Sequence, residues 1–209
     1  MTSLLSQGKI ESINRVQRNL DGDAYIANEI EVRLLEHLHN VEVPINRLDM
    51  LRDCTAEEMV SGVFSYQDAS FNYVIAHLVP LWQEDLAVFF QEACRMLAPN
   101  GVFLFSTLGK RTPHELEMLG DTLLRSEFQL PVVDREILQL QYDDINTLAK
   151  DLELSGLDSE FVQVTTNAPD DIIAMFEVFY GYALGKKINS LSPGKIEIPL
   201  ENITLRKIK

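Results

Sequence analysis

Residues 71–106, which read FNYVIAHLVPLWQEDLAVFFQEACRMLAPNGVFLFS, decide the fold of this chain. They contain two short apolar runs, Phe71–His77 and 102–106, of the kind that is buried on both faces of a parallel sheet. Between these runs, apolar residues recur at helical spacing over 84–97, and Pro99-Asn100-Gly101 provides a stop. A strand, a helix and a strand joined by a short turn predict a right-handed crossover between adjacent parallel strands. The fold class is therefore expected to be α/β.

Further elements are expected on both sides of this unit. Helical spacing predicts helices over 24–39, 113–125 and 143–154, the last of them ended by Gly156. Strand patterns predict strands over 45–51, 132–142 and 175–184, and alternation in the C-terminal segment predicts an edge strand over 195–205. We expect one domain over 1–209, with N-terminal helices in 1–44, a core in 45–187 and a basic edge segment in 188–209.

The chain is strongly acidic. Its 209 residues include 18 Lys and Arg against 32 Asp and Glu, which gives a net charge of -14. Residues 186–209 carry 6 of the basic and 2 of the acidic residues, so the rest has 12 against 30, or -18. Such a chain repels phosphates and anionic lipids, so neither nucleic acid nor a membrane is expected as a partner.

The cysteines and the N-terminus indicate the compartment. Cys54 and Cys94 are far apart and have no CxxC or His-rich surroundings, so neither a disulfide framework nor a metal site is expected. The first twenty residues lack the apolar core of a signal peptide, and no apolar run is long enough to span a membrane. We therefore expect a cytoplasmic protein.

Several strings of the chain match one family. They are DASFNYVIAHLVPLW (68–82), RMLAPNGVFLFSTLG (95–109), HEL (114–116), LQYDDINTLAKDLELSGL (140–157) and FEVFYGYALGK (176–186). Together they resemble the class I S-adenosylmethionine-dependent methyltransferases with a methyltransferase type 11 domain. The STLG turn, the YDD helix start and the aromatic last strand are similar to the malonyl-ACP O-methyltransferases of biotin synthesis. The mitochondrial complex I assembly factor that hydroxylates arginine is the second resemblance.

The chain departs from this family at the cofactor loop. Family members place a glycine-rich loop, D-x-G-C-G-T-G, after the first strand, so that the backbone can approach S-adenosylmethionine closely. Residues 48–54 here read LDMLRDC, without glycine. Only 19 residues lie between Leu51 and Phe71, too few for the two helices and two strands expected there. From the family order 3-2-1-4-5-7-6 we therefore expect a truncated Rossmann-like sheet, 1-4-5-7-6, which has about five core strands with flanking helices and lacks strands 2 and 3.

Three residues are candidates for the site. The resemblance implies that Asp49, at the end of the first strand, and His77, where the family often has Asn, contact the cofactor, and that Trp82 lies at the substrate. The structural alternatives are a turn or cap role for Asp49 and core packing for Trp82. His77 ends a strand, which is where α/β folds bind ligands. No catalytic residue is assigned.

Two functions are compatible with these patterns. The first is a degenerate, non-catalytic methyltransferase homologue, a pseudoenzyme that binds no cofactor. It would act through a protein partner or a homodimer at the sheet edge that the lost strands leave exposed. The alternative is an active S-adenosylmethionine-dependent O-methyltransferase with an atypical or partner-completed cofactor site. Because acyl carrier protein is itself acidic, we expect this chain to bind it poorly and not to methylate malonyl groups.

Overall fold

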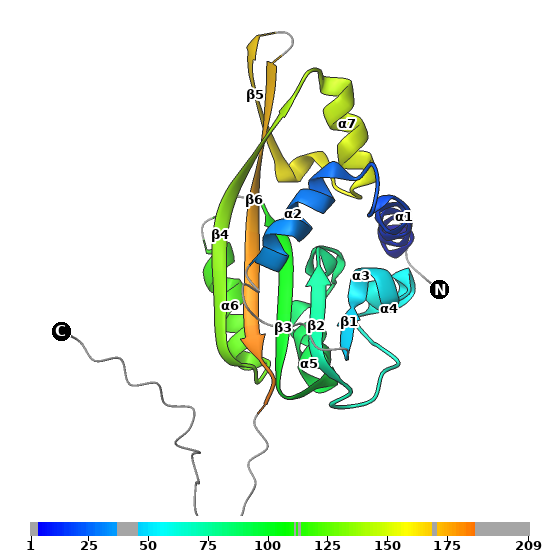
Figure 1. The fold of residues 1–209 in the computed structure, drawn as a ribbon, viewed down its shortest axis with the longest axis vertical. Coiled ribbons are helices and arrows are strands. Elements are labelled where there is room, and N and C mark those ends of the chain that lie inside the picture. Colours follow the sequence, from blue (N-terminus) through cyan, green and yellow to red (C-terminus); the bar gives the residue numbers. More distant parts are fainter. Residues whose placement is uncertain (1–3, 37–45, 111, 113, 169–170, 187–209) are drawn as a thin grey trace, which may run out of the picture.

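The computed structural model describes residues 4–36, 46–110, 112, 114–168 and 171–186 (Figure 1). Its elements in chain order are α1 (Leu4–Asn19), α2 (Tyr25–Glu36), β1 (Arg47–Asp49), α3 (Met50–Asp53), α4 (Ala56–Ser61), β2 (Phe71–His77), the 3-10 turn η1 (Val79–Trp82), α5 (Leu86–Met96), β3 (Leu97–Gly109), α6 (Glu115–Arg125), β4 (Gln129–Tyr142), α7 (Ile145–Leu154), the 3-10 turn η2 (Ser159–Phe161), β5 (Val162–Ala168) and β6 (Asp171–Leu184).

The strands form one mixed sheet in the order β1-β2-β3-β6-β4, and β5 also pairs with β6. β1, β2 and β3 are parallel, whereas β6 runs antiparallel to β3, β4 and β5. The predicted parallel pairing of Phe71–His77 with 102–106 is confirmed, with Ile75 opposite Leu104. The α/β fold class and its Rossmann-like arrangement are confirmed as well. The strand order is the one expected for 1-4-5-7-6, and residues 50–70 hold α3 and α4 but no strand.

Two sequence predictions differ from the structure. The strand expected over 45–51 is wrong at its carboxyl end, because β1 stops at Asp49 and the fully buried Met50 and Leu51 belong to α3. The sequence indicated burial there, but a run this short does not separate strand from helix. β5 was not predicted, because its VQVTTNA sequence is mostly polar and it is held by pairing with β6. The strand predicted over 195–205 lies outside the described residues.

Helices cover both faces of the sheet, with α2 in front and α5 and α6 behind in Figure 1. On the α5 face, aromatic rings form the core, and the rings of Phe90 and Phe105 lie 5.3 Å apart. The Phe105 ring occupies the space where a side chain on Gly181 would begin, 1.8 Å from that position. On the other face, Ile26, Ile30 and Leu34 of α2 are fully buried. The sheet therefore has a separate apolar layer on each side.

The start of α2 is anchored on α7. The backbone N–H of Ile26 donates to Asp151 Oδ1 at 3.2 Å, and that of Ala27 donates to Ser155 Oγ at 3.3 Å. The buried Asp151 also accepts the hydroxyl of Tyr142 through Oδ2 at 2.7 Å. These bonds satisfy N–H groups that a helix start leaves without partners. α7 therefore fixes where α2 lies on the sheet.

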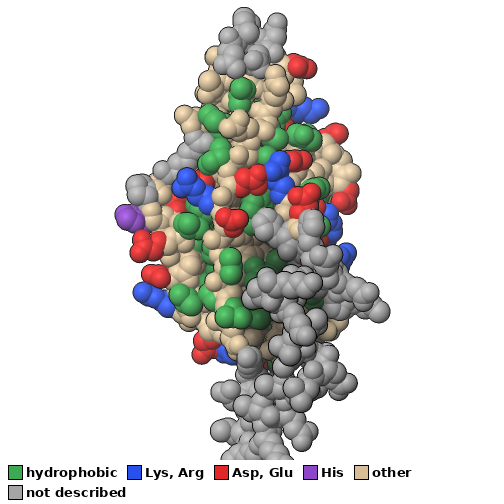
Figure 2. Space-filling view, turned by 60° about the vertical axis from the view of Figure 1, so that its left-hand side comes forward, with side chains coloured by type: hydrophobic (Ala, Val, Ile, Leu, Met, Phe, Trp, Pro, Cys, Tyr) green, Lys and Arg blue, Asp and Glu red, His purple; other side chains and the backbone are tan. Residues whose placement is uncertain are grey.

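The two edges of the sheet differ in length. At β1, the N–H of Asn72 donates to the carbonyl of Asn46 at 3.0 Å, so by alternation the N–H of Asp49 points away from β2. That N–H donates to Asp53 Oδ2 at 2.8 Å. At the other edge, the 14-residue β4 pairs only with β6 among the described strands. Figure 2 shows this side, where hydrophobic side chains alternate with charged ones. The β1 edge is protected from pairing with another chain, because it is short and its Asp49 N–H is already bonded. The β4 edge is long and offers more backbone groups for such pairing.

Candidate functional site

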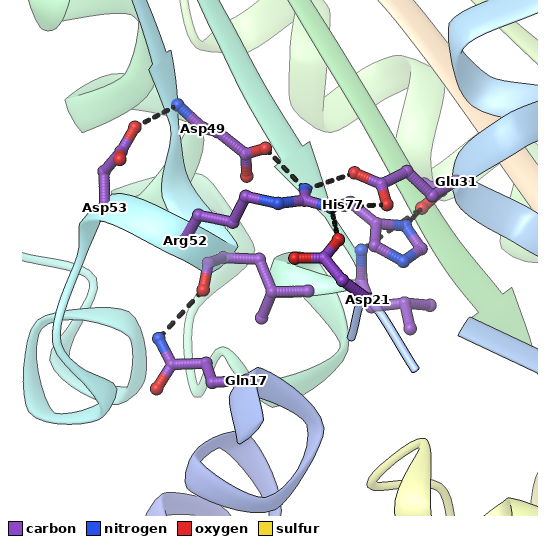
Figure 3. A network of polar contacts seen from close by, with 10 residues as sticks. Gln17, Asp21, Glu31, Asp49, Arg52, Asp53 and His77 are labelled. Atoms are coloured by element: carbon purple, nitrogen blue, oxygen red, sulfur yellow. Dashed lines mark hydrogen bonds and ion pairs between the residues drawn. The ribbon is translucent and has the colours of Figure 1, made fainter. Parts of the chain in front are cut away.

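Asp49 and His77 stand at the carboxyl ends of β1 and β2, where α/β folds bind ligands. They lie on the same face of the sheet, because Asp49 is paired with Ile75, two residues before His77. This is the face that α2 covers, and Figure 3 shows Asp49, His77 and the residues around them. The structure thus brings together the two residues that were predicted to contact the cofactor.

Arg52 of α3 fills the space beside Asp49 (Figure 3). Its guanidinium donates to Asp49 Oδ2 at 2.7 Å, to Asp21 Oδ1 at 3.0 Å and to Glu31 Oε2 at 2.9 Å. Burial raises the pKa of Asp49, although the neighbouring Arg52 lowers it. Hydrogen bonding to Glu31, more than any other contact, raises the pKa of Arg52. This ion cluster ties α2 and the segment before it to the end of β1.

The segment at the position of the glycine-rich loop is packed as core. Met50 and Leu51 are fully buried, and the side chain of Gln17 on α1 donates to the carbonyls of Leu51 at 2.8 Å and Cys54 at 3.0 Å. These two bonds satisfy carbonyls in and just after α3, where a short helix leaves acceptors without partners. The residues that follow β1 therefore contact the chain's own N-terminal helices.

His77 is a fully buried histidine under α2. Ser106 Oγ accepts the N–H of Leu78 at 3.1 Å and forms a second hydrogen bond, 2.8 Å long, with His77 Nδ1. Complete burial lowers the pKa of His77 to about 4, and the charge of Arg52 acts in the same direction against the opposing effect of Glu31. His77 is therefore neutral at physiological pH and is held in one orientation by Ser106.

Trp82 lies apart from these two residues, in the wall of a pocket with a volume of about 1000 Å³. This pocket is at the carboxyl ends of β2 and β3, between α1, η1, the start of α5, α6 and residues 156–161. Thr107, Glu115, Phe161 and Phe179 also line it, whereas Asp49 and His77 do not. The structure thus separates the predicted substrate contact from the two predicted cofactor contacts.

Glu177 adjoins this pocket and was missed by the sequence reasoning. It is 4% exposed, and its Oε2 has no hydrogen-bond partner among the described residues. It projects from β6 on the same face as Phe179, which lines the pocket, because residues two apart on a strand share a face. The signal was available as one acidic residue inside the apolar run MFEVFYGYAL.

The described residues contain neither a membrane-spanning helix nor a metal-binding cluster. No helix among them is long and apolar enough to cross a membrane. No group of three or more His, Cys, Asp and Glu within the same residues is arranged to hold a metal ion.

Comparisons with known proteins find similarity to methyltransferases and to a mitochondrial arginine-hydroxylase. A family model described as a methyltransferase domain matches residues 22–105. The chain is 29% identical over 193 residues to malonyl-[acyl-carrier protein] O-methyltransferase 1 of Coxiella burnetii, which covers 72% of this chain and 68% of that protein. It is 25% identical over 167 residues to the mitochondrial arginine-hydroxylase NDUFAF5 of Dictyostelium discoideum, over 68% of this chain and 38% of that protein.

Other matches are shorter or more distant. Malonyl-[acyl-carrier protein] O-methyltransferase of Methylovorus sp. is 34% identical over 107 residues, which is 42% of this chain and 36% of that protein. Among solved structures, phosphoethanolamine N-methyltransferase 2 of Haemonchus contortus in complex with S-adenosyl-L-methionine matches with a TM-score of 0.40 and 18% identity, over 73% of this chain and 40% of that one. The chain thus spans about two thirds of the first relative and little more than a third of the next two. The family resemblance drawn from the sequence is confirmed.

Proposed function

We propose that this chain, a relative of the class I S-adenosylmethionine-dependent methyltransferases, is a degenerate homologue that acts by binding a partner and does not transfer methyl groups. The observation that carries the proposal is the packing of the segment after β1, where the family resemblance implies a glycine-rich cofactor loop. α3 stands there with Met50 and Leu51 fully buried, and Arg52 bonds three carboxylates. A backbone that must approach a cofactor closely needs glycine, and this segment has none.

The cofactor pocket would also need space that the chain's own helices use. His77 is fully buried beneath α2, and Arg52 bonds Glu31 on α2 and Asp21 before it. Admitting S-adenosylmethionine beside Asp49 would require this ion cluster to open. Such an opening would leave charged groups partly buried without partners, which costs free energy that the ligand would have to supply.

Calorimetric titration with S-adenosylmethionine tests the proposal. We expect no saturable binding at concentrations up to about 1 mM, which corresponds to a binding free energy weaker than about -4 kcal/mol. The same cofactor stock should be titrated into the Coxiella burnetii relative as a positive control. Binding to this chain with a micromolar Kd would overturn the proposal.

A partner at the sheet edge is part of the same proposal. β1 offers an edge of three residues, and the Asp49 N–H there is bonded to Asp53, so pairing at β1 would add few hydrogen bonds. The edge of β4 is longer and carries the exposed Leu130 and Val132. Light scattering of the purified chain distinguishes a homodimer from a monomer that needs another protein.

Cys54 and Cys94 are buried and unpaired, which fits the cytoplasmic location that we propose with this function.

The alternative is an active O-methyltransferase whose cofactor site is atypical or is completed by a partner. The pocket of about 1000 Å³ at the ends of β2 and β3 favours this second candidate, because it has the size and the place of a ligand site. Incubation with malonyl-ACP and S-adenosylmethionine at low salt, followed by mass spectrometry for methyl ester, tests it. Multiple turnovers would establish the alternative, and their absence is the result that we expect.

A further inference from the structure

We propose that the pocket at the ends of β2 and β3 binds an organic cation, an alkylammonium group, whose charge is held near Glu115 and Glu177. This inference does not depend on whether the chain binds S-adenosylmethionine, because neither Asp49 nor His77 lines the pocket. It rests on the cavity itself, on a buried carboxylate oxygen that has no partner among the described residues, and on an ammonium group of the chain that already lies in the pocket wall.

The charges around the cavity are mostly negative. Among the described residues that line it, two are basic, Lys9 and Lys110, and five are acidic: Glu84, Asp85, Glu115, Asp158 and Glu160. Four of these carboxylates already have partners. Asp85 accepts the N–H groups at the start of α5, and Glu160 pairs with Lys110. Glu115 accepts the backbone N–H of Lys110 and the hydroxyl of Thr112, and Glu84 accepts the hydroxyl of Ser6. The remaining excess disfavours an anionic ligand and favours a cation.

Glu177 supplies the observation that points to a ligand. Its Oε1 lies 3.1 Å from Arg135, whereas its buried Oε2 receives no hydrogen bond from any described residue. A second carboxylate, that of Glu115, lies close to Glu177. Gly109 is opposite Glu177 in the sheet and leaves room for both, because a Cβ at Gly109 would lie 2.7 Å from Glu115 Oε2 and 2.8 Å from Glu177 Oε2. A buried acceptor without a donor is costly, and an ammonium group carries three donors. A cation reaching these two carboxylates would therefore fill an unmet hydrogen-bonding position.

Lys110 shows that the wall can hold an ammonium group. Its Nζ lies 2.8 Å from Glu160 Oε1 and 5.4 Å from the centre of the Phe161 ring. A carboxylate together with an aromatic face is a recurrent way to bind a cation. Trp82 and Phe179 add two further rings to the same cavity. The pocket thus combines the groups that recognise an amine, and a carboxylate substrate such as a malonyl group would meet charge of its own sign.

Trp82 provides the readout, because it is the single tryptophan of the chain and lies in the pocket. We would titrate the whole chain with spermidine, with a short neutral-ended peptide that contains one lysine, and with malonate, and follow Trp82 fluorescence at low ionic strength. Saturable quenching by either amine and none by malonate is expected. A response to spermidine alone would assign a free amine as the ligand, and a response to the peptide alone would assign a lysine side chain of a protein. No response to either amine at millimolar concentration would overturn the proposal.

Two variants separate the pocket from general attraction to an acidic surface. Glu177→Gln removes the buried charge, and we expect it to weaken amine binding about tenfold or more, as one charge-assisted bond implies. The matched control is Glu153→Gln, which changes an exposed carboxylate on α7 outside the pocket and should leave the affinity unchanged. Equal loss in both variants would show that the amine binds the surface in general.

Lys110→Met keeps the proposal testable if Glu177→Gln fails to fold. This substitution removes one of the two positive charges among the described residues that line the pocket, so a cation held near Glu115 and Glu177 meets less repulsion. We expect the amine to bind severalfold more tightly than to the unaltered chain. Unchanged or weaker binding would contradict the placement of the cation in this pocket.

Discussion

The substitution Arg52→Ala should destabilise the fold, because it removes the positive charge that neutralises three neighbouring carboxylates and leaves them to repel one another. The guanidinium pairs with Asp21, Glu31 and Asp49 at the junction of β1, α2 and α3. The side chains of Asp49 and Glu31 are 10% and 12% exposed, so water replaces little of the lost interaction, whereas Asp21 is 84% exposed and is readily hydrated. The cost of the substitution therefore falls on the two buried carboxylates.

The expected loss in the free energy of unfolding is about 2–3 kcal/mol at neutral pH. A hydrogen bond to a charged group contributes about 1.5–3 kcal/mol, and two buried carboxylates lose one each. The sum is reduced because the Arg52 side chain is 33% exposed and solvent screens its interactions. For a chain of this length, each kcal/mol corresponds to a fall in Tm of about 2–4 °C.

The stability deficit of Arg52→Ala should depend on pH, because the substitution changes the pKa of Asp49. Burial raises the pKa of Asp49 in the folded state, and removal of Arg52 raises it further. A carboxyl group with a higher pKa in the folded state binds more protons there, so its ionisation opposes stability at neutral pH and the opposition fades as the pH falls toward that pKa. The deficit of Arg52→Ala should therefore shrink between about pH 7 and about pH 5.

Urea unfolding at these two pH values, followed by Trp82 fluorescence and circular dichroism, measures the deficit. Arg18→Ala is the matched control, because Arg18 is an exposed arginine on α1 whose side chain donates to the backbone carbonyl of Asn14 at 3.0 Å. The control should stay within about 0.5 kcal/mol of the unaltered chain. A silent Arg52→Ala, or a deficit that widens in acid, would refute the reasoning.

Three further substitutions test the fold around the site. Asp151→Ala removes the anchor of α2 and should cost about 3 kcal/mol in urea unfolding, while Lys150→Ala on the exposed side of α7 should cost little. Phe90→Asp places a charge on the fully buried face of α5 and should yield aggregated protein, whereas Gln91→Ala, exposed on the same helix, should melt like the unaltered chain. Gly181→Ala puts a methyl group onto an aromatic ring of β3, so its Tm should fall by several degrees in a thermal melt.

The core of the fold could be predicted because its signals are local. Continuous apolar runs produced β2 and β3, and helical spacing with an Asn-Gly stop produced α5. The order of the sheet was implied by the family resemblance, and counting residues between Leu51 and Phe71 removed strands 2 and 3 from it; no strand lies there in the structure. β5 escaped prediction although four of its seven residues are β-branched, because it is mostly polar and residues 163–166 are exposed. Local pattern therefore identified the buried elements and missed an exposed one that forms a hairpin with β6.

The site was less accessible to sequence reasoning. Asp49 and His77 were placed correctly on neighbouring strand ends, but their partners Arg52 and Ser106 depend on how the helices pack. No spacing rule connects Arg52 to Glu31, which lies 21 residues earlier. Burial of Glu177 could have been suspected from its apolar neighbours, yet the cavity beside it is formed by elements spread from α1 to β6. Whether Asp49, His77 and Trp82 bind ligands stays a prediction.

The two regions are built from different parts of the chain. Asp49 and His77 lie under α2, whereas the pocket of Trp82 is lined by η1 and α6, by Thr107 and Leu108 near the end of β3, and by Phe179 within β6. α3, α1 and Arg52 pack around the end of β1 without filling the pocket. The buried Met50 and Leu51 add apolar surface to the core at that end of the sheet. Under the proposed function, a chain packed in this way keeps its fold and its pocket although it does not transfer methyl groups.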